Sequence, residues 1–362
     1  MRVLAIVNAL GRGGAELSLL RLAAAAREQG VEIVVLPLRA DASLAAELAA
    51  GGIAERVRVL RPGVVSLANG WMKGGFDVVE GWMYGGAVAS IAFERRAPVV
   101  WNLHHVPSDL SLESANTRRA LWTLARFGAP SRIHVNSASA ISAHRALGIE
   151  GDYRSICIGI DTERFRPCEE LREATRASIG LASDAQILLH VARFHPHKGH
   201  ARSVAAFARI AGDLPRAQLI CVGEGSENVI ALARTAGVAA RVRALSAVSN
   251  VIPLYAACDA VVSPSWTESF PTVVAEAMSC ARACVVTDVG ASALIVGDTG
   301  TVVREASVEA LAQAYADALE WSPQERADRG ERARARVVAM YSAAAMTSGY
   351  VASLRELIGS KG

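Results

Sequence analysis

Short runs rich in valine and isoleucine alternate with longer, alanine-rich segments of helical periodicity along most of the chain. Parallel strands need a crossover connection, usually a helix, so this order predicts parallel β-sheets covered by helices. The expected strands are residues 2–8, 32–38, 56–60, 76–81, 98–103, 132–137 and 153–158, then 186–192, 217–223, 241–245, 260–265, 283–289 and 301–304. The pattern therefore predicts an α/β fold, built twice.

Residues 161–170, DTERFRPCEE, separate the two sets of strands and are charged, contain proline and lack periodicity. Such a segment is typical of a linker. We expect an N-terminal Rossmann-like domain over 1–165, a C-terminal domain over 166–340 and a last helix over 341–362 that packs back on the N-terminal domain. Open parallel sheets bind ligands at the carboxyl ends of their strands, so we expect a site in a crevice that both sheets face.

Composition argues against several classes of protein. The six cysteines lack CxxC spacing, which indicates reduced thiols in a cytoplasmic protein. A net charge of +3 is too small to indicate a nucleic-acid partner. No apolar stretch reaches the ~18 residues of a membrane-spanning helix. The apolar N-terminal run ends in a glycine-rich loop, so we interpret it as a buried strand and not as a signal peptide.

A glycine-rich loop, GRGGAE at residues 11–16, follows the first expected strand and opens a helix. Glycines there let the backbone approach an anion at the helix N-terminus. Three interpretations stay open: an ordinary tight turn, a nicotinamide site and a substrate contact, which we favour. Glu16 occupies the third glycine position of a nicotinamide fingerprint, and the second strand ends without a carboxylate for a ribose.

A basic loop, RFHPHKGH at residues 193–200, follows the strand expected at 186–192. Its extended, proline-containing form lets Arg193 and Lys198 converge on one diphosphate. The alternative is a pair of solvated surface cations. Lys198 is one of three lysines in the chain and follows the carboxyl end of a strand, which favours the phosphate site. We interpret the loop histidines as not binding metal.

The segment SPSWTESFPTVVAEAMSC, residues 263–280, predicts a buried helix over 272–280 with Glu276 as its one charged residue. A buried carboxylate requires hydrogen-bond donors, and ligand hydroxyls can supply them. Glu268 lies in the preceding loop, and the amides around 269–272 lie at the positive end of the helix, where phosphate or sugar oxygens bind. The alternative is a capping arrangement of two structural carboxylates.

In this order and spacing, the motifs resemble those of the glycosyl transferases group 1 family, whose members are retaining enzymes of the GT-B fold. The resemblance covers almost the whole chain, and the segment with two glutamates is its most specific part. The matching segments are GGAE at 13–16, DVVEGWMYGG at 77–86, VVWNLHH at 99–105, GIDTERFRP at 159–167, VARFHPHKGH at 191–200, CVGEG at 221–225, ESFPTVVAEAMSC at 268–280 and VTDVG at 286–290. The resemblance implies two doubly wound domains that face a central cleft, an acceptor domain and a donor domain.

Residue roles follow from the resemblance by position. Arg193 and Lys198 would hold the diphosphate, Glu268 would contact the transferred sugar, and Glu276 would contact the ribose. His104 would lie near the reacting sugar, with His105 as the alternative for a one-residue slip. The implied catalytic residues are His104, Arg193, Lys198 and Glu268. The implied donor-binding residues are Gly13, Gly14, Arg193, Lys198, Gly223, Glu268, Ser269, Phe270, Pro271, Thr272 and Glu276.

Two positions depart from the family pattern. The family's Asn-Gly before the linker is Ile158-Gly159, which suggests altered acceptor or hinge contacts, and its glycine pair after TDV is Gly290-Ala291, which suggests a tighter sugar pocket. No two aspartates are spaced by one residue, so the metal-diphosphate motif of the other major glycosyltransferase fold is missing. We therefore expect no metal and no cofactor beyond the nucleotide-sugar donor.

The sequence thus predicts a retaining hexosyltransferase that moves a sugar from a nucleotide diphosphate to a saccharide or lipid-linked acceptor in bacterial-type glycan or polysaccharide biosynthesis. Within enzymes, a nucleotide-sugar epimerase of GT-B shape or a phosphorylase is the alternative. Outside enzymes, the alternatives are a catalytically dead sugar-nucleotide binding protein and a two-lobed solute-binding protein, which the missing signal peptide disfavours.

A basic, aromatic segment in the first half lies at residues 111–132. Its expected helix carries three arginines and a tryptophan, namely Arg118, Arg119, Arg126 and Trp122. Two interpretations stay open: a solvated helix packed by its leucines, which we favour, and peripheral contact with the anionic inner face of a membrane that carries a lipid-linked acceptor.

Overall fold

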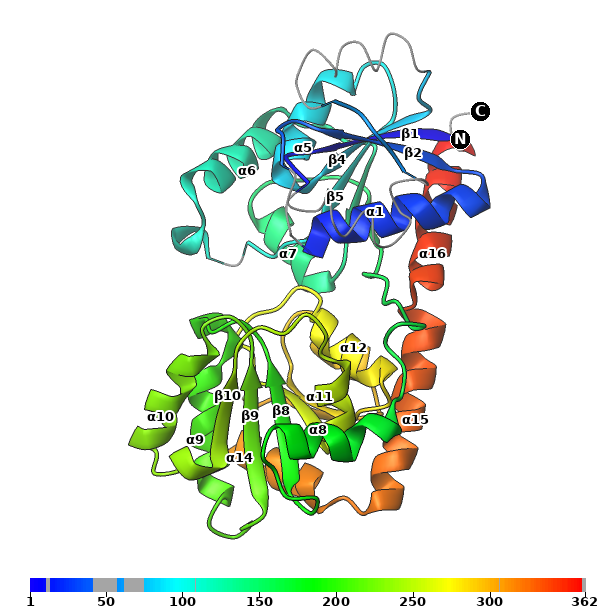
Figure 1. Cartoon of the computed structure of the whole chain (residues 1–362). Coiled ribbons are helices and arrows are strands. Elements are labelled where there is room, and N and C mark those ends of the chain that lie inside the picture. Colours follow the sequence, from blue (N-terminus) through cyan, green and yellow to red (C-terminus); the bar gives the residue numbers. More distant parts are fainter. Residues whose placement is uncertain (11–13, 42–56, 62–74, 108, 306, 360–362) are drawn as a thin grey trace. The chain divides into compact units, whose positions relative to one another are not determined.

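The computed structural model describes residues 1–10, 14–41, 57–61, 75–107, 109–305 and 307–359 (Figure 1). Its contacts divide the chain into two compact units. The N-terminal unit comprises Met1–Gly159 and Ala343–Gly362, and the C-terminal unit comprises Ile160–Ser342. Each unit contains a parallel β-sheet with helices on its faces, which confirms the predicted α/β fold built twice.

The described part of the N-terminal unit forms a seven-stranded parallel sheet in the order β3-β2-β1-β4-β5-β6-β7. Its strands are β1 (Arg2–Val7), β2 (Glu32–Pro37), β3 (Arg58–Val59), β4 (Val78–Trp82), β5 (Val99–Leu103), β6 (Arg132–Val135) and β7 (Tyr153–Ser155). Strands β4 and β5 are buried along their whole length, including Glu80 and Asn102, as expected for parallel strands with both faces of the sheet covered. The strand order reverses between β1 and β4, the kind of switch point at which open sheets bind ligands.

The two faces of this sheet bury different cores. One face packs against α1 and α16, where Tyr350 and Leu354 join the core of β1 and β4. The other face packs against α5, α6 and α7. The helices of the described unit are α1 (Gly14–Ala26), α5 (Met83–Ser90), α6 (Ala115–Phe127), α7 (Ala138–Ala146) and α16 (Ala343–Gly359), with 3-10 helices η1 (Arg27–Gln29), η2 (Ile91–Phe93) and η3 (Leu110–Leu112). Successive side chains of each strand therefore pack against opposite helix layers of the unit.

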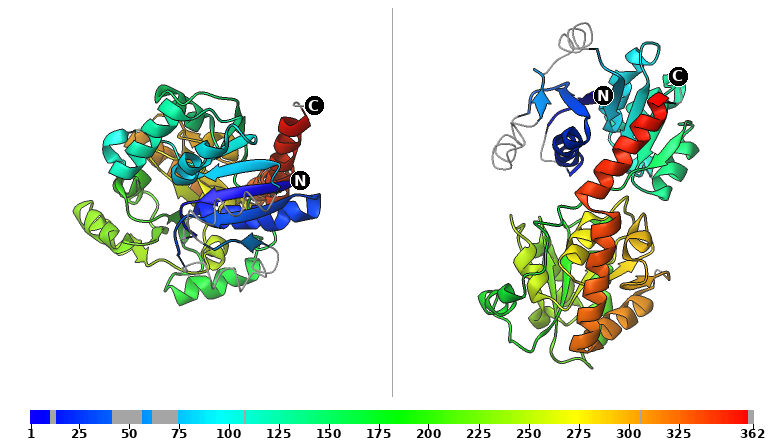
Figure 2. Two further views of the ribbon diagram at one scale, coloured as in Figure 1. Left: turned by 90° about the horizontal axis from the view of Figure 1, so that it is seen from above. Right: turned by 90° about the vertical axis from the view of Figure 1, so that its right-hand side faces the viewer.

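The described part of the C-terminal unit forms a six-stranded parallel sheet in the order β10-β9-β8-β11-β12-β13. Its strands are β8 (Gln186–Val191), β9 (Ala217–Val222), β10 (Val242–Leu245), β11 (Ala260–Ser263), β12 (Cys284–Thr287) and β13 (Thr301–Val303). Helices α9 and α14 cover one face, and α15 (orange in Figure 2) packs against α12. The helices are α8 (Arg172–Ser178), α9 (His200–Ile210), α10 (Val229–Thr235), α11 (Ile252–Ala257), α12 (Thr272–Ser279), α13 (Ser292–Val296), α14 (Val308–Glu320) and α15 (Pro323–Met340), with η4 (Glu169–Leu171), η5 (Pro196–Lys198), η6 (Ser226–Asn228) and η7 (Ala239–Arg241).

The C-terminal unit begins and ends at neighbouring points. The Ile160 amide donates to the Tyr341 carbonyl at 2.8 Å, and Ile160 forms a β-bridge with Ser342. Helix α16 begins one residue later and packs against α1 in the N-terminal unit. Across the described ranges, no helix has both the length and the apolar character needed to cross a membrane.

Candidate functional site

The carboxyl edge of the C-terminal sheet carries most of the residues predicted to bind the donor. Arg193 and Lys198 follow β8, Gly223 follows β9, and Glu268 follows β11. These three strands are neighbours in the sheet, and parallel strands bring their carboxyl ends to one edge. The fold therefore gathers loops that are up to about seventy positions apart in the sequence.

Lys198 and Glu268 form an ion pair at this edge. The Lys198 Nζ lies 2.7 Å from Glu268 Oε1, and the Ser265 hydroxyl donates to the same oxygen at 2.7 Å. The lysine side chain is 28% exposed and the carboxylate side chain 9% exposed. Sequence reasoning gave these two groups separate partners, whereas the structure pairs them directly. The ammonium remains accessible to a second anion while the carboxylate compensates its charge.

The loop that carries Lys198 is fixed to the end of β11. Gly199 has φ of +70°, and a Cβ atom there would lie 1.9 Å from the Pro264 carbonyl oxygen. The Trp266 amide also donates to the His197 carbonyl at 2.7 Å. Only glycine combines the left-handed conformation with this close approach. Gly199 therefore brings the lysine loop onto the strand that leads to Glu268.

Arg202, on α9, is a residue of this edge that sequence reasoning missed. Its buried guanidinium donates to the Pro264 carbonyl at 2.5 Å, to the Ser265 carbonyl and to Thr287 Oγ1 at 3.2 Å. The Arg202 guanidinium carbon lies 3.9 Å from the centroid of the Trp266 ring. Burial lowers the pKa of Arg202. Arg202 thereby links α9 to the ends of β11 and β12, and only its place just after the lysine motif hints at this role.

Arg193 lies on a fixed backbone, but its side chain is exposed. Gly223 has φ of +146°, and a Cβ atom there would lie 2.2 Å from the Ala192 carbonyl oxygen. The Phe194 amide donates to the Glu224 carbonyl at 2.7 Å. Among the described residues, the Arg193 guanidinium has no hydrogen bond or ion pair, so all of its donors remain available to a ligand.

Glu276 lies in α12, as predicted, but it is half-buried, and the expectation of a fully buried carboxylate is wrong. The helix buries Val274, Ala275 and its neighbours on one side, which leaves room for Glu276 at the other. The Tyr255 hydroxyl donates to Glu276 Oε2 at 3.4 Å. One carboxylate oxygen thus has a long hydrogen bond from the protein, and the side chain stays within reach of solvent.

The N-terminus of α12 has the predicted loop before it. Pro271 occupies the N-cap position and provides no side-chain cap, and Thr272 is the first helical residue. Phe270 is buried, with its ring 5.8 Å from that of Tyr341. The Ser269 carbonyl accepts from the amide of Ala291 at 2.9 Å. The loop is therefore anchored directly before the helix by a backbone hydrogen bond and a ring contact.

Gly290 backs the same loop from the end of β12. Its φ is +59°, and a Cβ atom there would lie 2.2 Å from the Glu268 carbonyl oxygen. The sequence motif VTDVG contains this glycine, but only the structure shows that it supports the glutamate. Any larger residue would clash with the Glu268 backbone and displace it.

Two stacked histidines lie near the two ends of the basic loop, His190 in β8 and His200 at the start of α9. The rings of His190 and His200 are 4.3 Å apart at an interplanar angle of 21°. Burial lowers the pKa of His200 to about 4 and that of His190 well below its usual value. Both imidazoles are therefore neutral near pH 7 and add no charge to the cationic loop. Sequence reasoning did not single them out.

In the N-terminal unit, the adjacent residues His104 and His105 have different surroundings. The His105 Nε2 atom lies 2.6 Å from Glu113 Oε1. Both ring nitrogens of His104 are buried and lack a hydrogen-bond partner among the described residues. Burial lowers the pKa of His104 to about 4. His104 thus keeps one donor and one acceptor unused, whereas His105 is engaged with a carboxylate.

The glycine loop is only partly described. Gly13 lies outside the described residues, and Gly14 is the first residue of α1, as the predicted loop-to-helix transition requires.

Helix α6 presents an exposed aromatic pair. The side chains of Trp122 and Phe127 are 63% and 58% exposed, and their rings are 5.6 Å apart in a T-shaped arrangement. The Arg126 guanidinium lies 5.6 Å from the Phe127 ring. Arg118 donates to the carbonyl of Glu113 at 2.7 Å. Arg118 is therefore turned toward the preceding loop, while the aromatic side chains face solvent.

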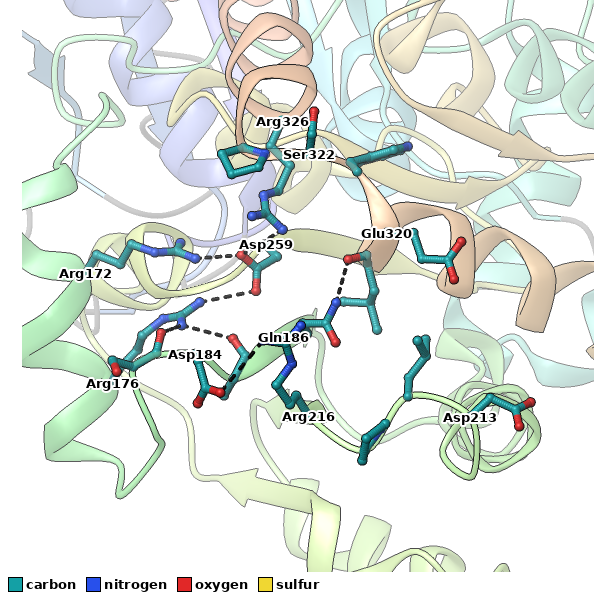
Figure 3. Close-up of a pocket in the computed structure, with 17 residues that line it drawn as sticks. Arg172, Arg176, Asp184, Gln186, Asp213, Arg216, Asp259, Glu320, Ser322 and Arg326 are labelled. Atoms are coloured by element: carbon teal, nitrogen blue, oxygen red, sulfur yellow. Dashed lines mark hydrogen bonds and ion pairs between the residues drawn. The ribbon is translucent and has the colours of Figure 1, made fainter.

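A cavity of about 700 Å³ opens at the opposite, amino edge of the C-terminal sheet (Figure 3). In its wall, Asp259 accepts from Arg172 at 2.6 Å and from Arg176 at 3.2 Å, and lies 3.5 Å from Arg326. The lining has four arginines and four acidic side chains, so its charges balance. This ion-pair cluster ties α8 and α15 to the sheet and lies away from the residues predicted to bind the donor.

Comparison with known protein families finds two adjacent matches. The glycosyl transferases group 1 model matches residues 172–336, and the glycosyltransferase family 4 model matches residues 12–164.

Curated relatives include the D-inositol 3-phosphate glycosyltransferase of Mycobacterium leprae, 32% identical over 230 residues, which are 60% of this chain and 52% of that protein. The protein of the same name from Mycobacterium tuberculosis is 33% identical over 212 residues, 56% of this chain and 43% of that protein. The chain spans about half the length of the curated relatives it matches.

Solved structures resemble the fold over nearly the whole chain. The structure of HepE from Anabaena in complex with UDP has a TM-score of 0.81 at 22% identity and covers 98% of this chain and 100% of its own. Sucrose-phosphate synthase from Thermosynechococcus elongatus has a TM-score of 0.76 at 20% identity, with 99% and 100% covered. WaaG, a glycosyltransferase involved in lipopolysaccharide biosynthesis, has a TM-score of 0.71 at 19% identity, with 96% and 98% covered.

At these identities the structures establish the fold, which is GT-B. The two family models together account for nearly all of residues 12–336. Residues 172–336 of the C-terminal unit therefore belong to the glycosyl transferases group 1 family, and residues 12–164 match glycosyltransferase family 4.

Proposed function

We propose that this protein is a metal-independent, retaining glycosyltransferase that moves a hexose from a nucleoside diphosphate to a saccharide or lipid-linked acceptor. The observation that carries the proposal is the ion pair of Lys198 with Glu268 at the sheet edge that also carries Arg193, whose guanidinium makes no hydrogen bond or ion pair with the described residues. Two cations and a carboxylate on one fixed edge match a ligand with a diphosphate and a hydroxylated sugar. The resemblance to HepE, solved with UDP-glucose, and to an inositol phosphate glycosyltransferase supports this ligand class.

The cations act mainly on the leaving group. Negative charge grows on the diphosphate as the bond from the anomeric carbon to the phosphate oxygen breaks, and fixed cations stabilise that charge without reorganisation. Lys198 bridges phosphate oxygen and Glu268, so the lysine also orients the carboxylate toward the sugar hydroxyls. Glu276 accepts hydrogen bonds from the ribose hydroxyls.

Retention follows when the acceptor oxygen attacks the anomeric carbon on the face that the diphosphate leaves. The acceptor hydroxyl gives its proton to the departing phosphate oxygen, so one C–O bond forms as another breaks. From the N-terminal unit, His104 contributes a donor and an acceptor that no described residue uses and that a sugar hydroxyl would satisfy. The protein then works mainly by positioning and electrostatics.

A thermal-shift panel with UDP-, GDP- and ADP-sugars, followed by transfer assays on the stabilising donor, tests the proposal. We expect one donor class to stabilise the protein, transfer to survive excess EDTA, and NMR of the product to show the donor's anomeric configuration. Loss of transfer with EDTA and its return only with manganese would refute metal independence. An inverted product would refute retention.

The alternatives give different outcomes in the same assays. Conversion of the donor's sugar without any acceptor would identify an epimerase. Tight donor binding without transfer to any acceptor in a panel of saccharides and lipid-linked saccharides would identify a catalytically inactive binding protein.

We also propose that α6 places the protein on anionic membranes that carry a lipid-linked acceptor. The exposed rings of Trp122 and Phe127 and the neighbouring Arg119 and Arg126 support this, because aromatic side chains enter the interface while cations contact anionic headgroups. Sedimentation with phosphatidylglycerol vesicles should recover the protein, and Trp122→Ala should weaken recovery. Equal recovery with phosphatidylcholine vesicles, or none with either, would leave α6 as a solvated helix.

A further inference from the structure

Five polar or aromatic side chains of the N-terminal sheet point to the same face. Trp82 of β4 pairs with Asn102 of β5, and Asn102 pairs with His134 of β6. Side chains two positions apart in a strand share a face, so Glu80 joins Trp82, and His104, just beyond β5, continues the line of Asn102. This is the face that α16 covers. The register therefore brings a buried carboxylate and an indole to the same layer as His104.

Glu80 fixes the Trp82 indole. The Trp82 Nε1–H donates to Glu80 Oε2 at 3.0 Å, and both side chains are buried. Gly81, between them, lets α5 approach, because a Cβ atom there would lie 2.3 Å from the Ala87 Cα atom. Met83 follows with φ of +55°, an unusual conformation for a large side chain. The indole is thus held by a hydrogen bond within its strand and by a tight turn directly after it.

Trp82 in turn fixes His104. The two ring centroids are 5.0 Å apart at an interplanar angle of 36°. A functional histidine is usually oriented by a hydrogen bond to its second nitrogen. His104 has no such bond among the described residues, so ring packing against Trp82 is what sets its orientation. Both nitrogens are buried and make no hydrogen bond with the described residues, so a sugar hydroxyl that reached them would find both unused.

We propose that Glu80 and Trp82 are positioning residues that hold the His104 imidazole for sugar transfer, with Glu80 acting through Trp82. This inference rests on the proposed glycosyltransferase function, in which His104 contacts the sugar. Neither residue touches the substrate in this arrangement. A misplacement of about 1 Å can cost on the order of a hundredfold in rate, so the support of a catalytic side chain has a measurable effect.

The surroundings of Glu80 make this support depend on pH. Trp82, Asn102 of β5 and Tyr350 of α16 face the carboxylate, and none of them carries charge near pH 7. Burial raises the pKa of Glu80 to about 7. Burial lowers the pKa of the neighbouring His134 to about 3, so that ring is neutral as well. The ionised carboxylate accepts a stronger hydrogen bond from the indole than the protonated form does, so the hold on Trp82 tightens as pH rises through about 7.

The decisive variants are Trp82→Phe and Glu80→Gln. Trp82→Phe keeps an aromatic ring but loses the N–H, and we expect kcat to fall about tenfold or more with little change in donor KM. Donor affinity should hold because the proposed phosphate contacts lie in the C-terminal unit. Glu80→Gln keeps an oxygen acceptor but cannot ionise, so kcat should fall less and its rise with pH near 7 should disappear.

Trp101→Phe is the matched control. Trp101 is a fully buried tryptophan of β5 on the opposite face of the sheet, and its Nε1–H donates to Ser90 Oγ at 3.1 Å. The same substitution there removes a comparable hydrogen bond without touching His104. An equal loss of kcat in Trp101→Phe would show a general loss of packing and overturn the proposal.

A spectroscopic measurement is independent of activity. In protein with ¹⁵N-labelled histidine, the ring signals of His104, assigned with His104→Gln, should shift in Trp82→Phe and Glu80→Gln but stay in place in Trp101→Phe. Unchanged His104 signals in folded Trp82→Phe and Glu80→Gln would overturn the proposal. If wild-type protein transfers no sugar while these signals do shift, the glycosyltransferase proposal fails and the hold of Trp82 on His104 stands.

Discussion

The candidate donor edge of the C-terminal unit and the His104 face of the N-terminal unit hold their polar side chains in place by different interactions. At the donor edge, the half-buried charges of Lys198 and Glu268 are paired before any ligand arrives. On the other face, neither nitrogen of His104 has a hydrogen-bond partner in the part of the chain that the structure describes, and the ring packs against Trp82. Charged groups cost too much to hold at a half-buried site without a partner, whereas a neutral imidazole can be left open. The donor edge thus relies on charge compensation between side chains, whereas the His104 face relies on ring packing to orient an imidazole.

The largest expected effect tests the charged side of this comparison. Lys198→Ala and Arg193→Ala should each lower kcat about a hundred- to a thousandfold, because each removes a fixed cation from developing charge. Arg193→Lys should restore activity only in part, since an ammonium lacks the planar fork of donors. Steady-state kinetics at saturating donor, with folding checked by circular dichroism, measures this.

The double variant should lose less than the sum of the two single losses in free energy, because both cations act on one diphosphate. Arg234→Ala, at an exposed arginine of α10, is the control and should leave kcat unchanged. Single variants with near wild-type turnover would reduce the pair to surface charges.

The two glutamates sharpen the comparison within the donor edge. Glu268→Gln should lower kcat by about a hundredfold, since it loses both the sugar contact and the ion pair with Lys198. Glu276→Gln should instead weaken binding of the free nucleoside diphosphate by about tenfold or more, the typical effect of losing a hydrogen bond to a charged group. Calorimetric titration beside kinetics separates the two. Equal weakening of nucleotide binding in both variants would contradict the assignment.

The two adjacent histidines test the uncharged part of the comparison, the His104 face. His104→Gln should lower kcat at least about tenfold, because a glutamine cannot place a donor and an acceptor as the ring does. His105→Gln should have a much smaller effect, since its ring is engaged with Glu113. Parallel kinetics of the two variants measures this, and a larger loss in His105→Gln would reverse the assignment.

The smallest effect concerns the backbone under Lys198. Gly199→Ala should destabilise the C-terminal unit by more than about 2 kcal/mol, because left-handed strain adds to a clash with the Pro264 carbonyl. Gly237→Ala is the control, with φ of +73° and no protein atom within 4 Å, and should cost about 1 kcal/mol. Urea unfolding of both variants compares them. Equal destabilisation would mean that the close approach at Gly199 is not what fixes the loop.

The sequence predicted where the candidate donor residues lie along the chain, but not how they bond to one another. Arg193, Lys198 and Glu268 fall in loops after strands, as the periodicity indicated. The pairing of Lys198 with Glu268 joins positions seventy residues apart, and the expected full burial of Glu276 is wrong. Arg202 follows the lysine motif but lies outside it, and its partners, two backbone carbonyls and the Thr287 hydroxyl, lie at the ends of other strands.

By itself, the sequence determined the α/β character of both units, the order of the strands along the chain and the loops that carry the candidate donor residues. These depend on local periodicity and on glycine positions, which a single segment can express. Only the tertiary structure decided that α16 covers the face of β4 and β5 and that the Trp82 ring packs against His104. Those contacts depend on sheet order and register, because a side chain's neighbours in a parallel sheet come from strands that are distant in the sequence.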